Sequence, residues 1–184
     1  QYQADAAIRA SLERLSGRNK SAVFRVRAPE PDSLLVAEAN ASGWLVKPLA
    51  AGSNALYVRA RDRSVRWETV RDLAANIHEL DLSDVAFSAQ WKNLLSECAN
   101  LSMLNLSRCT GIGHILGVVS PNHLRVLILN QTDLDNPDVL IALTRLERVY
   151  LLGTELRPEA IDAFKASRPS VEVIAQRFAF EAGR

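Results

Sequence analysis

The side chains that most often carry out chemistry are few in this chain, and they are not arranged in known catalytic spacings. The histidines are His78, His114 and His123, and none belongs to an HxxxH or HExxH pair. We therefore expect structural roles for all three and no metal site. Gly111 and Gly113 are not followed by a phosphate-binding GxGxxG or GxxxxGKS pattern, and no GxSxG nucleophile motif occurs.

The two cysteines, Cys98 and Cys109, lie 11 residues apart and form no CxxC pair. Two cysteines do not define a disulfide framework. Their positions indicate small buried apolar residues, one on an inward helix face and one at the turn after a strand. The sequence thus predicts no catalytic residue, no cofactor and no metal, and we expect that the protein is not an enzyme.

A run of arginines is the strongest charge feature of the chain. Its guanidinium groups belong to Arg59, Arg61, Arg63 and Arg66, at a predicted strand end and the turn that follows. The guanidinium group of arginine binds carboxylates and phosphates well. Three alternatives therefore exist for this run: a solvated rim, a protein-docking patch or an anion site. No aromatic residues interleave with these arginines, and we expect no nucleic-acid partner.

Size and composition indicate one folded domain. The chain has 184 residues, of which 48% are hydrophobic, and a formal net charge of +1. Residues 1–71 hold 12 Lys and Arg against 7 acidic residues, whereas residues 72–184 hold 10 against 14. This asymmetry could steer a partner. No apolar run approaches the ~18 residues of a membrane span, and we expect the chain to be part of a larger protein.

The elements that must position these side chains follow from a repeat of the form LxxLxL. It occurs without gaps at residues 77–82, 101–106, 124–129 and 146–151. The last apolar residues of these segments are spaced by 24, 23 and 22 residues, at Leu82, Leu106, Leu129 and Leu151. A period of this length is typical of a solenoid, in which stacked repeats bury one continuous core.

Each repeat combines a strand with a helical return. Apolar residues recur at three- and four-residue spacing between the strands, and Pro137 and Pro158 are well placed for helix starts. The fold class is therefore α/β, a leucine-rich-repeat solenoid with one curved parallel sheet and helical returns. Its six parallel strands are predicted at residues 56–58, 80–82, 104–106, 127–129, 149–151 and 171–173.

Residues 1–55 do not carry the repeat and are predicted to form an N-terminal α/β cap, with the repeats and a C-terminal cap in residues 56–184. Ala6, Ile8, Leu12 and Leu15 predict an amphipathic helix. Strands are predicted at 23–26 and 43–46 and a helix at 34–39. At the other end, Phe178 and Phe180 are expected to close the last repeat.

Residues 146–154, with the motif LxxLxLxxT, and the following 156–161 resemble bacterial leucine-rich repeats. Residues 43–49 and 54–58 are similar to the start of the C-terminal repeat domain of membrane-bound c-type cytochrome proteins. The resemblance covers about residues 35–175. The acidic-glycine helix start of those repeats is absent, and the chain contains no CxxCH haem-attachment motif. The resemblance implies that haem and membrane anchor would belong to other parts of such a protein, and it transfers no catalytic residue.

Strand alternation directs every second side chain away from the helical returns. One outward row is predicted to hold Tyr57, Asp81, Asn105, Ile128, Tyr150 and Glu172. An exposed apolar patch is predicted across three strands, formed by Met103, Val126, Ile128, Tyr150 and Leu152. Such a patch suits a protein partner. The alternative is that the N-terminal segment or a neighbouring domain covers it.

These patterns favour a non-enzymatic protein-interaction domain of a larger extracytoplasmic protein, with a periplasmic location implied by the resemblance. The partner would be another protein or a neighbouring domain of the same polypeptide. A second hypothesis is a structural accessory domain packed on a c-type cytochrome or membrane module. A third is an enzyme that uses the arginine run for an anionic substrate. The sequence does not identify the partner or the oligomeric state.

Overall fold

The computed structural model describes residues 28–86, 91–117 and 123–175, which form a single seven-stranded sheet with the strands in chain order. Six strands, β2 to β7, run parallel, while β1 pairs antiparallel with β2. The prediction of one parallel sheet built from the repeats is confirmed. The strands are β1 Trp44–Pro48, β2 Leu56–Ala60, β3 Ile77–Asp81, β4 Met103–Asn105, β5 Val126–Ile128, β6 Arg148–Tyr150 and β7 Glu172–Ile174.

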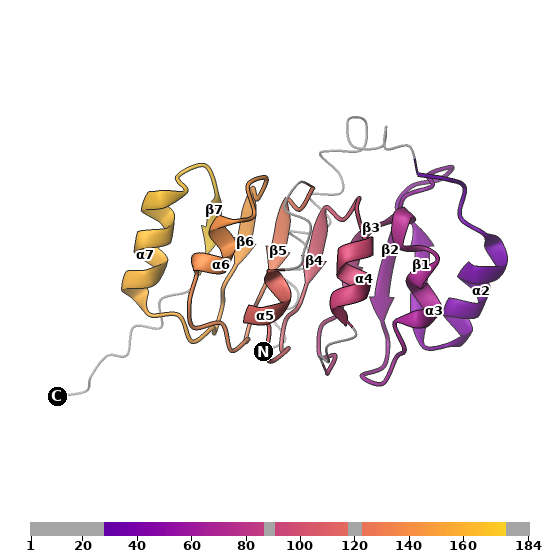
Figure 1. Ribbon diagram of the computed structural model, residues 1–184, viewed down its shortest axis with the longest axis horizontal. Coiled ribbons are helices and arrows are strands. Elements are labelled where there is room, and N and C mark those ends of the chain that lie inside the picture. Colours follow the sequence, from indigo (N-terminus) through magenta and orange to yellow (C-terminus); the bar gives the residue numbers. More distant parts are fainter. Residues whose placement is uncertain (1–27, 87–90, 118–122, 176–184) are drawn as a thin grey trace.

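The helical returns lie along one side of this sheet (Figure 1). Most are a single turn, and the longest return is α7, where Pro158 occupies the first turn as predicted. The helical segments are α2 Ser33–Ala41, α3 Glu68–Arg71, the 3-10 turn Ala74–Asn76, α4 Trp91–Glu97, α5 Gly113–Leu116, α6 Asp138–Ile141 and α7 Pro158–Ser167. Together they give the α/β solenoid that the repeat spacing predicts.

The core lies between the sheet and the helical layer. Leu80, Leu104, Leu127 and Val149 pair side by side across four strands and are fully buried. Helical residues such as Leu94 pack against the same continuous cluster. Each fully buried leucine contributes roughly 1.5–3 kcal/mol through the removal of apolar surface from water.

The register of the four central strands, β3 to β6, agrees with the prediction, but the register at both ends is wrong by two residues. Tyr57 pairs with Glu79 rather than with Asp81, so the paired residues of β2 and β3 are 22 residues apart where the prediction used 24. At the other end, Glu172 pairs with Arg148, and Ile174 takes the place beside Tyr150. The LxxLxL motif is absent from β2 and β7, so their alignment was predicted from the repeat spacing alone.

The chain before the repeats contributes to the same sheet. The helix predicted at 34–39 is present as α2, and the strand predicted at 43–46 is present as β1. Trp44 of β1 is fully buried, with its ring centroid 6.1 Å from that of Trp91 in an edge-on arrangement. The predicted helix around Ala6–Leu15, the strand at 23–26, and Phe178 and Phe180 lie outside the described residues.

Candidate functional site

The side of the sheet opposite the helices is called here the outer sheet face. Strand alternation places the core leucines on the inner side and their neighbours in sequence on this face. Two outward rows cross the central strands. One contains Glu79, Met103, Val126, Arg148 and Glu172, and the other contains Arg59, Asp81, Asn105, Ile128, Tyr150 and Ile174.

The centre of the outer sheet face is apolar but is not exposed. Ile128 is 0%, Tyr150 4% and Met103 8% accessible, whereas Val126 and Leu152 are half-buried. The predicted exposure of this patch is therefore wrong at three of its five positions. The three buried side chains do not belong to the continuous core cluster between sheet and helices. The sheet thus buries apolar surface on both of its sides.

Two polar residues beyond the strand ends share this burial. Ser107 is 5% and Asn130 6% accessible. Asn130 Oδ1 accepts a hydrogen bond from the backbone N–H of Leu152 at 3.0 Å, while its amide nitrogen has no hydrogen-bond partner among the described residues. The assignment of this patch to a partner stays a prediction.

Towards β1 the outer sheet face becomes polar and aromatic. The Lys47 Nζ lies 5.0 Å from the centre of the Tyr57 ring, a cation–π contact. Burial, reinforced by the nearby Asp81 carboxylate, raises the pKa of Tyr57 to about 12. Burial also raises the pKa of Glu79, against the lowering effect of Lys47. This end of the face presents charges of both signs around one aromatic ring.

The predicted arginine rim is largely ion-paired within the protein. Arg59 Nε lies 3.5 Å from Asp81, Arg63 Nη2 lies 3.3 Å from Asp84, and Arg66 Nε lies 3.8 Å from Glu68. Arg61 is exposed. Acidic partners offset most of the positive charge that an anion would seek. The structure therefore gives a mixed-charge rim rather than a concentrated cationic site.

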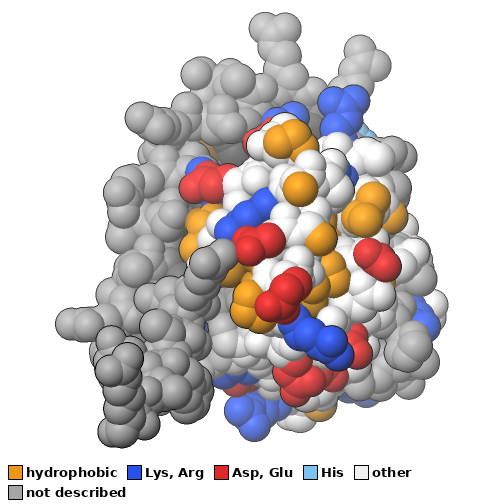
Figure 2. All heavy atoms as spheres, turned by 90° about the vertical axis from the view of Figure 1, so that its left-hand side faces the viewer, with side chains coloured by type: hydrophobic (Ala, Val, Ile, Leu, Met, Phe, Trp, Pro, Cys, Tyr) orange, Lys and Arg blue, Asp and Glu red, His pale blue; other side chains and the backbone are white. Residues whose placement is uncertain are grey.

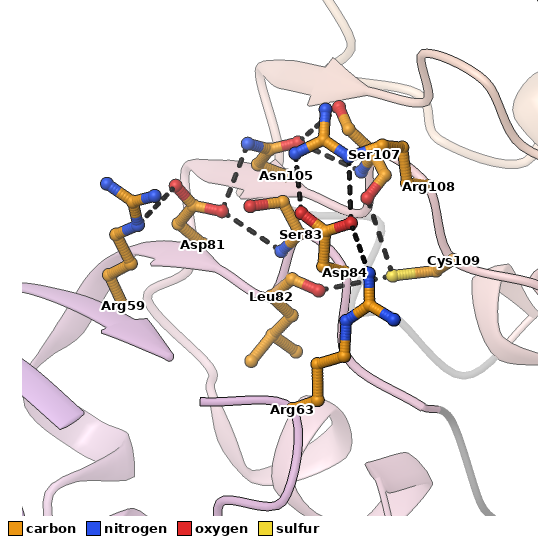
Figure 3. A network of polar contacts seen from close by, with 10 residues as sticks. All are labelled: Arg59, Arg63, Asp81, Leu82, Ser83, Asp84, Asn105, Ser107, Arg108 and Cys109. Carbon is orange, nitrogen blue, oxygen red and sulfur yellow. Dashed lines mark hydrogen bonds and ion pairs between the residues drawn. The ribbon is translucent and has the colours of Figure 1, made fainter. Parts of the chain in front are cut away.

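Part of this rim is a polar ladder that connects successive repeats (Figure 3). Asn105 Nδ2 donates to Asp81 Oδ1 at 3.0 Å, and each of these side chains accepts from the backbone two residues on, at Ser107 and Ser83. Arg108 binds the carboxylate of Asp84 through Nε at 2.8 Å. This ladder was not predicted from the sequence, although Asp81 and Asn105, like Asp84 and Arg108, are separated by one repeat of 24 residues.

The cysteines have the buried structural positions that the sequence predicts. Both are free and nearly inaccessible. Burial raises the pKa of Cys98 and that of Cys109 to about 12, so neither thiol ionises near neutral pH. Cys109 Sγ donates to the backbone carbonyl of Leu82 at 3.1 Å. Both thiols are suited to packing rather than to nucleophilic chemistry.

Two of the histidines, His78 and His123, lie close enough to interact electrostatically. His78 is 2% accessible, and its Nε2 has no hydrogen-bond partner among the described residues. Burial lowers the pKa of His78, and the proximity of His123 lowers it further. His123 is exposed and His114 lies in α5. Within residues 28–86, 91–117 and 123–175, no group of three His, Cys, Asp or Glu side chains could hold a metal ion.

The end of the array formed by α7 and β7 shows no dominant charge (Figure 2). Hydrophobic side chains alternate there with acidic residues and with Lys and Arg. Arg148 and Glu172 form an ion pair across β6 and β7. In the part of the chain that the structure describes, no helix is both long and apolar enough to cross a lipid bilayer.

Solved structures match this chain, whereas family models and curated proteins do not. No family model matches the chain, and no curated protein matches it significantly. A leucine-rich-repeat protein of Leptospira interrogans is similar in structure, with a TM-score of 0.44 and 23% identity. The similarity covers 60% of this chain and 28% of that chain. The leucine-rich-repeat description of the fold rests on the strand order, register and repeat spacing of this chain itself.

Proposed function

We propose that this chain is a non-enzymatic protein-interaction domain of leucine-rich-repeat type, and that its outer sheet face binds polypeptide. The observation that carries the proposal is the second apolar surface of the sheet. Met103, Ile128 and Tyr150 lie outside the core between sheet and helices, yet they are buried. A solenoid needs only one apolar side to fold, so apolar residues on the other side point to contact with another segment.

The composition of the outer sheet face also supports polypeptide as the ligand. Its centre is apolar and contains an aromatic ring and a thioether, which are enriched in the cores of protein interfaces. Its border towards β1 carries Lys47, Arg59, Glu79 and Asp81, charges of both signs. A polar border around an apolar centre is the usual arrangement of interfaces between proteins.

The same face would serve an accessory domain that packs on another module of one polypeptide. This second candidate is favoured by the apolar character of Met103, Ile128 and Tyr150, since permanent interfaces are more hydrophobic than transient ones. The similarity of residues 43–49 and 54–58 to cytochrome-linked repeat domains suggests a c-type cytochrome or membrane module as that neighbour. A location outside the cytoplasm, in the periplasm, belongs to this proposal and rests on the same resemblance.

Catalysis on an anionic substrate is the least supported alternative. An anion site on the rim would have to compete with Asp81, Asp84 and Glu68 for the guanidinium groups. Separating one of these exposed pairs would cost at most about 1 kcal/mol, but the neighbouring carboxylates would still repel an anion. The ion-paired rim is better suited to fixing the turns of neighbouring repeats.

A photo-crosslinking amino acid placed at Val126 of the natural full-length protein tests the proposal. Val126 lies half-buried on the outer sheet face, and we expect it to crosslink to one defined polypeptide, identified by mass spectrometry. The matched control is Ile141, which is 45% exposed at the end of α6 in the helical layer. The proposal fails if position 126 yields no polypeptide product, or only the products that position 141 also yields.

A further inference from the structure

We propose that the open edge of β7 binds an extended segment of a partner polypeptide, which adds to the sheet as a further strand. The open edge is the side of β7, Glu172–Ile174, that faces away from β6. It is a different surface from the outer sheet face, so this inference goes beyond the proposed function. The segment that fits the edge has a basic residue followed by two apolar residues.

The two borders of the sheet differ in how their backbone groups are bonded. At the first border the Asn40 side chain closes β1, because its Nδ2 donates to the carbonyl of Val46 at 3.2 Å and its Oδ1 accepts from the Val46 N–H at 3.1 Å. Pro48 of the same strand has no N–H to offer. At the last border β7 pairs with β6 and with no other strand of the described residues. Unpaired groups at the edge of a sheet are a template for a further strand.

The hydrogen bonds of β7 direct one of its residues at the open edge. In β6, the first and last residues bond to β5, which leaves the middle residue to bond to β7. In β7 the Glu172 N–H donates to the carbonyl of Glu147, and the Ile174 carbonyl accepts from the N–H of Leu151, both at 2.8 Å. This is the same pattern, so the N–H and C=O of Val173 point away from β6. They offer one donor and one acceptor to a neighbouring backbone.

Three residues are enough for strand pairing in this sheet. The strands β4, β5 and β6 are also three residues long, and each of them pairs with a neighbour on both sides. A segment that continued this parallel arrangement would place its own three residues beside Glu172, Val173 and Ile174 in turn.

Charge complementarity favours a basic residue at the first of these positions. The Glu172 side chain is 59% exposed, and Arg148 binds it from the side of β6. Asp84 shows that one carboxylate of this array can bind two arginines, since Arg63 from the turn before it and Arg108 from the turn after it both contact it. A basic residue of the added strand would bind Glu172 in the same way from the other side.

The second and third positions favour apolar residues. Val173 and Ala175 at the edge and Ile161 of α7 pack against the core, yet all three remain partly exposed. A side chain beside Val173 would face this apolar end of the core, because strand alternation directs it to the same side. A side chain beside Ile174 would continue the apolar part of the outer sheet face.

The position of α7 favours an extended segment over a second copy of this chain. Figure 1 shows that α7 lies further along the array than β7. A strand added at the open edge would lie about 4.8 Å from β7 and alongside α7. A second copy paired through its own β7 would bring its own α7 into this space, although packed helices need about 8–10 Å between their axes.

A library of random nine-residue peptides displayed on phage, selected on the full 184-residue chain, tests the proposal. We expect the selected peptides to share a basic residue followed by two apolar residues. Binding of a selected, fluorescein-labelled peptide, measured by fluorescence anisotropy, should weaken about ten-fold or more with Val173→Pro, which removes the N–H at the edge. The matched control Val173→Ile keeps this N–H and should bind within about two-fold of the unmodified protein.

Two measurements keep the result independent of folding. Val173→Pro should keep its thermal unfolding transition, because the Val173 N–H is not used towards β6 and proline is accepted at the edge of a sheet. Glu172→Lys changes an exposed side chain and should weaken the same peptide about ten-fold as well. A peptide whose basic residue is replaced by Glu should bind Glu172→Lys better than it binds the unmodified protein.

Binding that depends on Val173 and on the charge at position 172 supports the proposal. It is overturned if no peptide is selected, or if the selected peptides are indifferent to Val173→Pro and Glu172→Lys. Val126→Asp separates the two surfaces, since Val126 lies on the outer sheet face. Peptides sensitive to Val126→Asp alone would overturn this inference and leave the proposed function standing, whereas edge binding without any Val126 crosslink would do the reverse.

Discussion

Arg108 binds the carboxylate of Asp84, the residue that holds the corresponding position 24 residues earlier in the preceding repeat. Both residues have left-handed backbone conformations, with φ of 62° and 65°. Gln131 and Gly153 continue the series in the next two repeats, with φ of 56° and 67°. The turns after β3, β4, β5 and β6 thus share a left-handed position, which glycine adopts without strain and which costs energy for most other residues.

The ion pair between Asp84 and Arg108 should contribute to stability only while the carboxylate is ionised. The hydrogen bond from Arg108 is the main cause of the lowered pKa of Asp84. A carboxyl group whose pKa is lower in the folded state stabilises the fold above its unfolded pKa of about 4 and loses that contribution as the pH falls through the folded value. Double-mutant cycles with Asp84→Ala and Arg108→Ala in urea should give a coupling of about 0.5–1 kcal/mol at neutral pH, since both groups are partly exposed.

This coupling should disappear in acid, and the more exposed pair Arg66–Glu68, at 3.8 Å, should show almost none at any pH. Coupling that stayed constant on acidification would show that the Asp84–Arg108 contact is not electrostatic.

Gly153→Ala should destabilise the protein by about 1–2 kcal/mol, because a side chain at positive φ is strained. An added Cβ would also lie 3.3 Å from Gln131 Cγ. Gly113→Ala is the matched control, since Gly113 lies in α5, has no positive φ and has nothing within 4 Å of the added Cβ. That control should be neutral or stabilising by about 0.5–1 kcal/mol in thermal unfolding. Equal losses in both variants would contradict the role of the left-handed turn.

Leu129→Ala should reduce the free energy of unfolding by about 2–5 kcal/mol, because it leaves a cavity at a fully buried position. Asn105→Ala should cost less, since Asn105 is only half-buried. Asn130→Ala should cost about 1 kcal/mol, because it leaves the part-buried N–H of Leu152 without its acceptor. Urea denaturation measures all three. A loss at Asn105 equal to that at Leu129 would show that the inward and outward sides are assigned wrongly.

Stability should fall when the pH drops below about 6.5, the usual pKa of histidine, because of His78. Burial, with a smaller effect from His123, lowers the pKa of His78. The folded protein therefore favours the neutral imidazole of His78, whereas the unfolded chain takes up a proton more readily. The free energy of unfolding is thus highest above the unfolded pKa and decreases on acidification. His78→Gln should flatten this pH dependence in chemical denaturation between about pH 7.5 and 5.5. His123→Gln, at an exposed site, should change it only slightly, and the reverse order would contradict the assignment.

The central part of the fold was predictable because its signal is repeated. The segments that contain Leu82, Leu106, Leu129 and Leu151 share one motif, and their register follows from it without knowledge of long-range contacts. The terminal strands lack the motif, so Tyr57 and Glu172 were placed two residues away from their true neighbours. The alignment of these strands rested on repeat spacing alone, and the true spacing of the paired residues, 22 for Tyr57 and Glu79 and 24 for Arg148 and Glu172, differs by two residues from the spacing used.

The site was harder to predict than the fold. Alternation correctly directed Met103, Ile128 and Tyr150 away from the helices, but it gave no information about what lies over them. Accessibility depends on contacts between distant segments, whereas the direction of a strand side chain is local. The partners of Arg59 and Arg63 are acids one repeat ahead, and only the folded turns bring them together.

The antiparallel strand β1 limits where further repeats could be added to the sheet. A further repeat of this type would need a parallel edge on which to add its strand, and β1 presents the wrong direction at that border of the sheet. Gene duplication could therefore lengthen the protein only between β2 and β7 or beyond β7, in units of 22 to 24 residues. Such a change would widen the outer sheet face strand by strand, while the border of the sheet at β1 stayed in place.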